Sequence, residues 1–168
     1  GEEIMSRAIT GPTIQGYGFD VTAQPVVSAG AYVAGDIVGG LMTFEVSESP
    51  NAPVIITGIE VAIKAAITSS LKMVFFNAKP FNTTTTDNSA YSLSALDVFK
   101  VITVVDLSAS TVLATDHGTP NTYSAHNLNL VCRPEKDKRC VHALLIDGTG
   151  FTPTGTADIQ VRLRGLGA

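Results

Sequence analysis

Apolar residues recur at every second position in several segments of this sequence. The pattern is clear in residues 157–164 and recurs in residues 55–63 and 128–132. A period of two places successive side chains on opposite faces of a β-strand, with one face buried and the other in water. The pattern therefore predicts an all-β protein made of half-buried strands.

Such segments, bounded by Gly, Pro, Asn and Asp, follow one another along most of the chain. The expected strands are residues 19–27, 37–46, 54–66, 71–77, 98–107, 111–115, 121–132, 140–146 and 157–164. No crossover helix separates them, so we expect antiparallel pairing. The spacing of the strands predicts a single antiparallel β-sandwich with at most one short helix. That helix is expected at residues 90–97, with Asn88 or Ser89 as its N-cap.

Individual residues refine these strands. Pro25 indicates that the first strand lies at a sheet edge, and Gly39-Gly40 indicates a bulge in the second. Every second residue from Ile55 to Ile63 is expected to share one buried face. Residues 71–77 are apolar in both alternating sets, which predicts a strand covered on both sides. Residues 106–110 are expected to turn.

The N-terminal residues lack this alternation and contain several Gly and Pro residues. We expect residues 1–17 to form an extended arm and residues 18–168 to form one β-sandwich domain. An arm of this kind can pack on a neighbouring subunit, and the alternative is a segment without fixed structure.

The chain carries few charges for a soluble domain. Charged residues make up 15% of the sequence, against about 25% in a typical soluble domain. The mean hydropathy is +0.26. We expect part of the surface to be covered by other subunits, and the alternative is an unusually apolar monomer.

Charge and apolar patterning exclude two classes of partner. The net charge is −4 and the basic residues form no stripe, so we expect no nucleic-acid binding. The longest apolar segments are too short to cross a bilayer, so we expect no membrane partner. Residues 1–5 are acidic and lack a signal-like apolar segment, and synthesis in a cytoplasm is therefore expected.

The sequence offers no catalytic constellation. It contains no Gly-x-Ser-x-Gly elbow, and His117, His126 and His142 have no spacing typical of a nucleophile–base pair. The His-x-His pair of a cupin-type metal enzyme is also missing. We therefore expect a protein that is not an enzyme, with no catalytic residues and no cofactor.

One group of residues has the chemistry of a metal site. Cys140 and His142 are two residues apart and share a strand face, and Cys132 would lie opposite Cys140 if residues 133–139 formed the charged tip of a hairpin. Zinc would need His126 as a fourth ligand. The alternatives are a Cys132–Cys140 disulfide and two free thiols. We expect free, reduced thiols and no bound metal.

Two sets of charged residues are candidate ion sites. The carboxylates in or beside loops, which Ca²⁺ could use, are Asp87, Asp97, Asp106, Asp116 and Asp147. They lack the spacing of a Ca²⁺-binding loop. The basic residues between the cysteines are Arg133, Lys136, Lys138 and Arg139. Glu135 and Asp137 are interleaved with them, which favours a solvated loop over a phosphate site.

Three segments resemble a family of phage virion proteins. Residues 28–44 read SAGAYVAGDIVGGLMTF and match its Tyr-x-x-Gly-Asp-Val-Val-Gly-Gly-Leu pattern. Residues 74–80 read VFFNAKP and resemble its Phe-x-Asn/Asp-x-x-Pro strand end. Residues 86–105 resemble its Thr-Asp-Asn-x-Ala … Asp … Lys-Ile-Ile-Gly-Val-Val segment. The sequence departs from the pattern at Thr103, where Gly is expected, and in residues 132–140.

The resemblance covers about residues 28–107 and implies a jelly-roll protein that decorates, or cements, the heads of tailed phages. It implies binding to the major capsid protein on the outer surface of the virion. Together with the low charge, it leads us to expect a homotrimer. Asp36 is expected to form a turn after Gly35, and Asp87-Asn88 to cap the short helix.

A glycan-binding or host-surface-binding module is the alternative function, since jelly rolls also serve as lectins. Lectin grooves usually present aromatic platforms. This chain has no Trp, and its tyrosines are Tyr17, Tyr32, Tyr91 and Tyr123.

Overall fold

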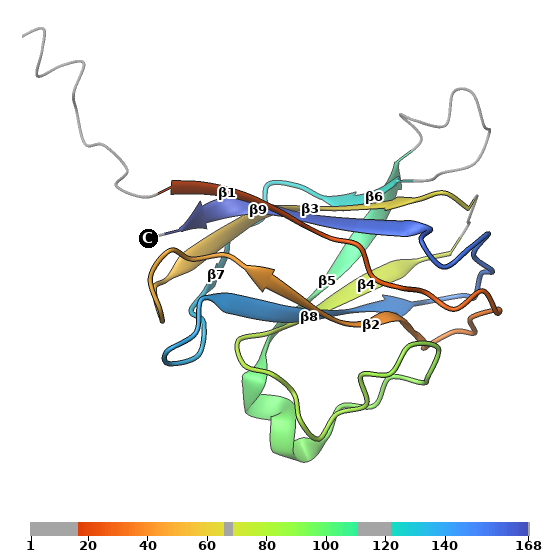
Figure 1. Cartoon of the computed structure of the whole chain (residues 1–168), viewed down its shortest axis with the longest axis horizontal. Coiled ribbons are helices and arrows are strands. Elements are labelled where there is room, and N and C mark those ends of the chain that lie inside the picture. Colours follow the sequence, from red (N-terminus) through yellow and green to blue (C-terminus); the bar gives the residue numbers. More distant parts are fainter. Residues whose placement is uncertain (1–16, 66–68, 111–121, 168) are drawn as a thin grey trace, which may run out of the picture.

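The computed structural model describes residues 17–65, 69–110 and 122–167 (Figure 1). Over these residues it has nine β-strands and one 3₁₀ helix. In chain order they are β1 (Tyr17–Ala23), β2 (Ile37–Glu45), β3 (Val54–Ile63), β4 (Leu71–Phe76), η1 (Ala95–Lys100), β5 (Val101–Ser110), β6 (Thr122–Ala125), β7 (Leu130–Cys132), β8 (Cys140–Asp147) and β9 (Ile159–Gly167). The predicted arm lies outside the described residues, except that Tyr17 begins β1.

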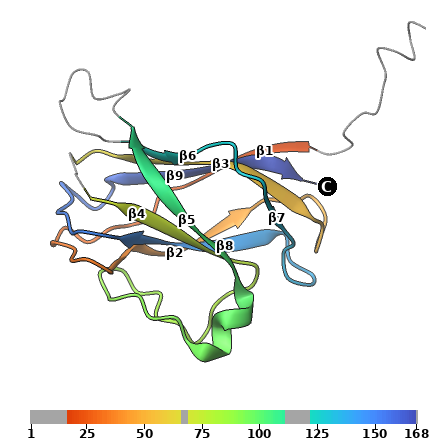
Figure 2. The same ribbon diagram turned by 180° about the vertical axis from the view of Figure 1, so that it is seen from behind.

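The strands form two antiparallel layers that β5 joins. The first sheet has the order β1-β9-β3-β6, with β7 also paired to β3, and the second has the order β5-β4-β8-β2. The beginning of β5 pairs with β4, and Ser108–Ser110 pair with β6, so β5 crosses from one layer to the other (Figure 2). Chain neighbours mostly alternate between layers, as in a jelly roll. The predicted antiparallel β-sandwich is confirmed.

The main core lies between the two sheets. Ile159, Val161 and Leu163 of β9 are buried, while Gln160 and Arg162 between them are exposed, so the predicted alternation is confirmed within β9. Just before the strand it is wrong, because Ala157 is exposed and Asp158 is buried. These residues meet large side chains of the second sheet, such as Phe44 and Phe75. Burying each large apolar side chain stabilises the fold by about 1.5–3 kcal/mol.

Two glycines bend β2 where the sequence predicted a bulge. Gly39 and Gly40 have φ angles of 79° and 73°, and the register between β2 and β8 shifts between Val38 and Met42. A Cβ on Gly39 would lie 2.4 Å from Cβ of Pro25. The prediction that β1 lies at a sheet edge is also confirmed, although the strand begins at Tyr17 and ends at Ala23.

The prediction that one face of the third strand is buried throughout is wrong. Val54 and Ile56 are buried, and the register with β9 then shifts between Ile56 and Gly58. The shift moves the buried set by one residue, so that Ile59 is again buried. As a result, Ile55 and Thr57 lie on the opposite face.

Other boundaries also differ from the predictions. The single strand expected at residues 121–132 is two strands, β6 and β7, and Asn127 between them has a φ of 56°. The turn expected at residues 106–110 is absent because β5 continues to Ser110. The strand expected at residues 111–115 lies outside the described residues.

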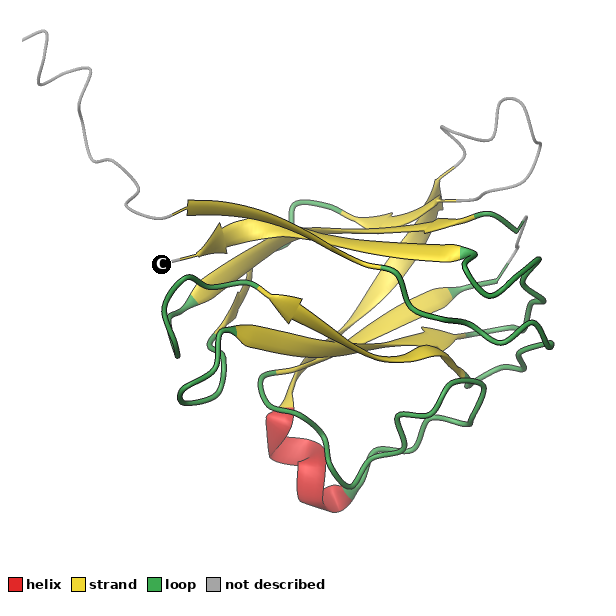
Figure 3. Ribbon diagram, viewed as in Figure 1, coloured by secondary structure: helices red, strands yellow, loops and turns green. Residues whose placement is uncertain are grey.

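The outer face of the second sheet carries a second, smaller core. Its buried residues are Ile37, Val74, Phe76, Leu144 and Ile146. Tyr91 and Leu93 pack against them from the segment that joins β4 to η1, and Figure 3 shows this loop and the helix below the sheet. Because β4 contributes to both cores, the prediction that it is covered on both sides is confirmed.

Candidate interaction surface

The segment between β4 and η1 is fastened to the sheet by Asp87. Its Oδ1 accepts hydrogen bonds from the Tyr32 hydroxyl at 2.7 Å and the Gly39 N–H at 2.6 Å, and its Oδ2 accepts one from the Ser28 N–H at 2.8 Å. Burial, together with the Asp87 carboxylate, raises the pKa of Tyr32 well above its usual range, so its hydroxyl stays protonated and keeps donating. Two of the segments that carry the family resemblance meet at this carboxylate.

Backbone contacts extend the same attachment. The Val33–Asp36 turn is closed by the Asp36 N–H, which donates to the Val33 carbonyl at 3.0 Å, and Asp36 Oδ2 accepts from the Val33 N–H at 2.8 Å. The predicted turn is thus confirmed. Beyond it, the Ile37 N–H donates to the Ser89 carbonyl at 2.9 Å, and the Asn88 N–H donates to the Ile37 carbonyl at 2.8 Å.

The short helix differs in place and cap from the prediction. It spans Ala95–Lys100, and the hydroxyl of Ser94 accepts from the Leu96 N–H at 3.3 Å. The expectation that Asp87-Asn88 caps the helix is wrong, because Asp87 is occupied by the contacts to Ser28, Tyr32 and Gly39.

Asp97 holds the helix to the preceding loop. Its side chain is 0% exposed, and Oδ2 accepts from the N–H groups of Asn82 and Thr83 at 2.8 and 2.7 Å and from the Thr83 hydroxyl at 2.9 Å. Oδ1 accepts from Lys100 Nζ at 2.7 Å. Burial alone would raise the pKa of Asp97, but the Lys100 ammonium and these donors hold the pKa well below its usual range.

The η1 helix buries its acidic residue and exposes its apolar residues, which is the reverse of an ordinary surface helix. Its one buried residue is the aspartate, whereas Leu96 is 73% exposed and Phe99 is 96% exposed. Residues three apart lie above one another on a 3₁₀ helix, so Leu96 and Phe99 share one outward face. Since apolar burial is the main driving force of folding, this arrangement costs the monomer a stabilisation that an ordinary amphipathic helix would provide.

Phe81 extends the apolar face from the loop that Asp97 anchors. It is 75% exposed, and the ammonium groups of Lys79 and Lys100 lie 5.6 and 5.1 Å from the centre of its ring. Phe81, Leu96 and Phe99, with these two lysines at their margin, are called the η1 surface below. A large exposed apolar group bordered by charge is typical of a protein-binding site.

Sequence reasoning did not single out the η1 surface. The one available signal is the segment Ala95–Lys100, in which Asp97 is surrounded by apolar residues. A lone acid in such a segment can occupy the exposed face of a helix or the buried one, and only the donors of Asn82 and Thr83 decide between them.

The predicted hairpin between the two cysteines does not exist. Cys132 in β7 belongs to the first sheet and Cys140 in β8 belongs to the second, and both are free thiols. Burial raises the pKa of Cys132 to about 11. Cys140 Sγ lies 4.0 Å from Nε2 of His142.

The remaining candidate ligands are dispersed. Nδ1 of His142 lies 2.9 Å from the Thr43 hydroxyl, and burial lowers the pKa of this imidazole. His126 is exposed in the turn before β7, and His117 and Asp116 lie outside the described residues. Asp147 is buried against Ser69, whereas Asp106 is exposed beside Lys72. No group of three His, Cys, Asp or Glu side chains in the described ranges could hold a metal ion.

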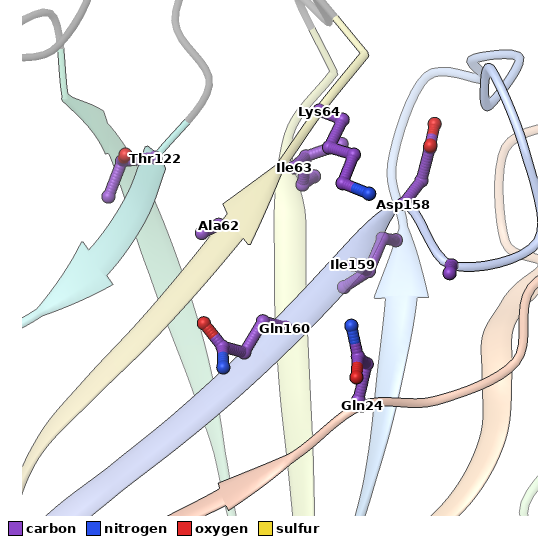
Figure 4. A pocket seen from close by; sticks show the side chains of 9 residues that line it. Gln24, Ala62, Ile63, Lys64, Thr122, Asp158, Ile159 and Gln160 are labelled. Carbon is purple, nitrogen blue, oxygen red and sulfur yellow. The ribbon is translucent and has the colours of Figure 1, made fainter.

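A shallow groove lies between the ends of β3 and β9 (Figure 4). It has a volume of about 300 Å³, and the side chains around it include Gln24, Lys64, Asp158 and Gln160. The Asp158 carboxylate accepts from the Thr154 hydroxyl at 2.8 Å. None of the described residues lining the groove is aromatic, so the groove lacks the platform expected of a lectin.

Comparison with known proteins gives distant structural likeness only. The sequence matches no protein-family model and no curated protein sequence. A structure of tomato aspermy virus is 10% identical, with 98% of this chain and 94% of that chain covered and a TM-score of 0.41. A structure of desmodium yellow mottle tymovirus is 12% identical, with 93% and 89% covered and a TM-score of 0.31. Because both TM-scores are below 0.5, any function is argued from this chain's own residues.

Over the ranges that the structure describes, none of the helical residues forms a segment long and apolar enough to cross a membrane.

Proposed function

We propose that this chain is a structural virion protein that decorates the head of a tailed phage and cements it by binding across major capsid protein subunits. The observation that carries the proposal is the η1 surface. An apolar helix face that projects into water, fixed in place by a buried carboxylate, has its physical explanation in a protein partner.

The residues that carry the family resemblance support the same function, because they hold the η1 surface in place. Among them, Tyr32, Gly39 and Asp87 form the attachment that holds the segment carrying Phe81 and η1 against the sheet. The motif is therefore a scaffold that presents a surface.

To cement the head, the protein needs only to bind the assembled lattice more tightly than the separated subunits. A protein that binds the assembled lattice and not its separated subunits stabilises the lattice by mass action, by about 2.7 kcal/mol per site at a concentration one hundred times the Kd. In this proposal the protein is made in the host cytoplasm, associates as a homotrimer and sits on the outer surface of the head. In the same proposal the residues that precede β1 contact the major capsid protein or a neighbouring copy.

Purified particles test the proposal. Quantitative mass spectrometry is expected to find this chain in fixed proportion to the major capsid protein. Heads stripped of it are expected to disassemble at lower temperature and to recover when the purified protein is added back. Absence from the particle, or no change in head stability, would refute the role.

A matched pair of variants links the role to the η1 surface. Phe99→Glu is expected to abolish recovery, because it places a charge on the most exposed apolar residue of the surface. Val26→Glu is the control, since Val26 is 73% exposed outside that surface. Binding of the purified protein to host glycans, with no binding to heads, would instead favour the host-surface module.

A further inference from the structure

A second apolar surface lies beside β5, where the two sheets separate. In the described part of the chain, Val101–Leu107 of β5 pair only with β4, and pairing with β6 begins at Ser108. A groove of about 360 Å³ follows this unpaired edge, between residues 103–106 of β5 and residues 128–130 before and within β7.

The lining of this groove is apolar with an acidic margin. Val104 is 53% exposed, and Val105, Leu128 and Leu130 are half-buried and pack against the main core. The Asp106 side chain is 84% exposed, and its carboxylate lies 3.8 Å from Lys72 Nζ. The groove thus offers open apolar contacts next to an accessible carboxylate.

The η1 surface has the complementary character. Phe81, Leu96 and Phe99 project outward, and the ammonium groups of Lys79 and Lys100 stand beside the ring of Phe81. One chain cannot join its own two surfaces, because β5 begins directly after η1 and runs away from it. A rise of about 3.3 Å per residue puts Val105 roughly 13 Å beyond Val101.

We propose that the η1 surface of one copy docks in the β5 groove of the next copy, with Lys79 facing Asp106. Such a contact is heterologous, since two different surfaces meet, and it closes into a ring when every copy uses both. The low charged fraction of the chain, 15%, agrees with surfaces that self-association covers. The inference deepens the proposed function by making a neighbouring copy the partner of the η1 surface, so that Phe99→Glu would abolish the recovery of heads by dissociating the homotrimer. It rests on the proposed function only for the number of copies.

Two substitutions at exposed positions remove one surface each. Phe99→Glu places a charge on the η1 surface, and Val104→Glu places one in the groove. Val131→Glu is the matched control, because Val131 is 60% exposed on β7 outside the groove lining. Light scattering of the wild type and of the control is expected to give the same multiple of 17.5 kDa, whereas each of the other two variants is expected to be monomeric.

Mixing the two monomeric variants is the decisive measurement. The Phe99→Glu chain keeps an intact groove and the Val104→Glu chain keeps an intact η1 surface, so an equimolar mixture is expected to form a one-to-one heterodimer and no larger ring. A mixture that stays monomeric, a Val104→Glu variant that assembles like the wild type, or a monomeric wild type at micromolar concentration would overturn the proposal.

A charge exchange provides an independent test that leaves the apolar contacts intact. Asp106→Lys alone is expected to weaken association at least tenfold, and Lys79→Glu in the same chain is expected to restore much of it. Equal weakening in the single and double variants would count against the docking arrangement. These masses judge self-association alone, while the particle measurements above judge the virion role, so the two can fail separately.

Discussion

The two apolar cores of this protein are held together in different ways. The main core lies between two sheets whose strands satisfy their backbone groups by pairing with one another. The smaller core on the outer face of the second sheet is covered by a segment without regular strands. There Asp36, Asp87 and Asp97 accept hydrogen bonds from backbone N–H groups. Carboxylates thus satisfy backbone N–H groups here, as strand pairing does in the sheets.

This difference has consequences for stability. Apolar burial in the main core is shared by every strand, so damage there weakens the whole domain. The covering segment depends on a few polar anchors, and losing one is expected to release that segment while the sandwich stays folded. Because the η1 surface belongs to this segment, the anchors also set the geometry of the surface that we propose docks in a neighbouring copy.

The largest effect is expected from the main core. Phe75→Ala removes a ring that is 0% exposed and should lower the free energy of unfolding by about 3–5 kcal/mol. Urea denaturation followed by circular dichroism measures it. Val26→Ala, at a side chain that is 73% exposed outside both proposed surfaces, is the control and should change the value by less than about 0.5 kcal/mol. Equal losses in the two variants would remove the distinction between core and surface.

Asp97→Asn tests whether the covering segment opens by itself. The amide lacks the charge that pairs with Lys100 and accepts through one oxygen, so the N–H groups of Asn82 and Thr83 should exchange with deuterium much faster. Amides of β8 should keep their wild-type rates, and Asp137→Asn, at an exposed carboxylate outside both proposed surfaces, should change neither. Faster exchange in β8 as well would mean that the two regions unfold together.

Tyr32→Phe removes one donor from the Asp87 attachment. A hydrogen bond to a charged group contributes about 1.5–3 kcal/mol, and the hydroxyl also accepts from the Ser28 N–H at 2.9 Å. We expect a loss in that range, measured by urea denaturation. A double-mutant cycle with Asp87→Asn should show coupling between the two residues, and purely additive losses would contradict the attachment.

The smallest effect concerns acid. The folded protein holds the pKa of Asp97 below the ordinary value of 3.8, so the folded state binds fewer protons than the unfolded state. The stabilisation is complete well above pH 4 and fades as the pH falls below about 4, toward the folded pKa. The difference in unfolding free energy between wild type and Asp97→Asn should therefore shrink from pH 7 to pH 3. A constant difference would mean that the charge of Asp97 is not involved.

The sequence pattern alone predicted the buried face of a strand correctly where no bulge interrupts the alternation. The alternation predicted at residues 157–164 is present from Ile159 onward, and the strand predicted at residues 71–77 is covered on both sides, because the side-chain direction in a strand repeats every two residues. Gly39-Gly40 indicated its bulge for a similar local reason, since both residues adopt a positive φ that other residues rarely take.

The sequence by itself determined the all-β class, the antiparallel pairing and the faces of most strands, because these depend on periodicity within a few residues. Only the tertiary structure decided which face of β3 is buried before its bulge, that Cys132 and Cys140 belong to different sheets, and that Asp97 points inward. Each of these depends on groups far along the chain: β9 for the bulge, β3 and β2 for the cysteines, and the N–H groups of Asn82 and Thr83 for the aspartate. Burying that carboxylate turns Leu96 and Phe99 outward, and the η1 surface therefore has no signature in the local pattern.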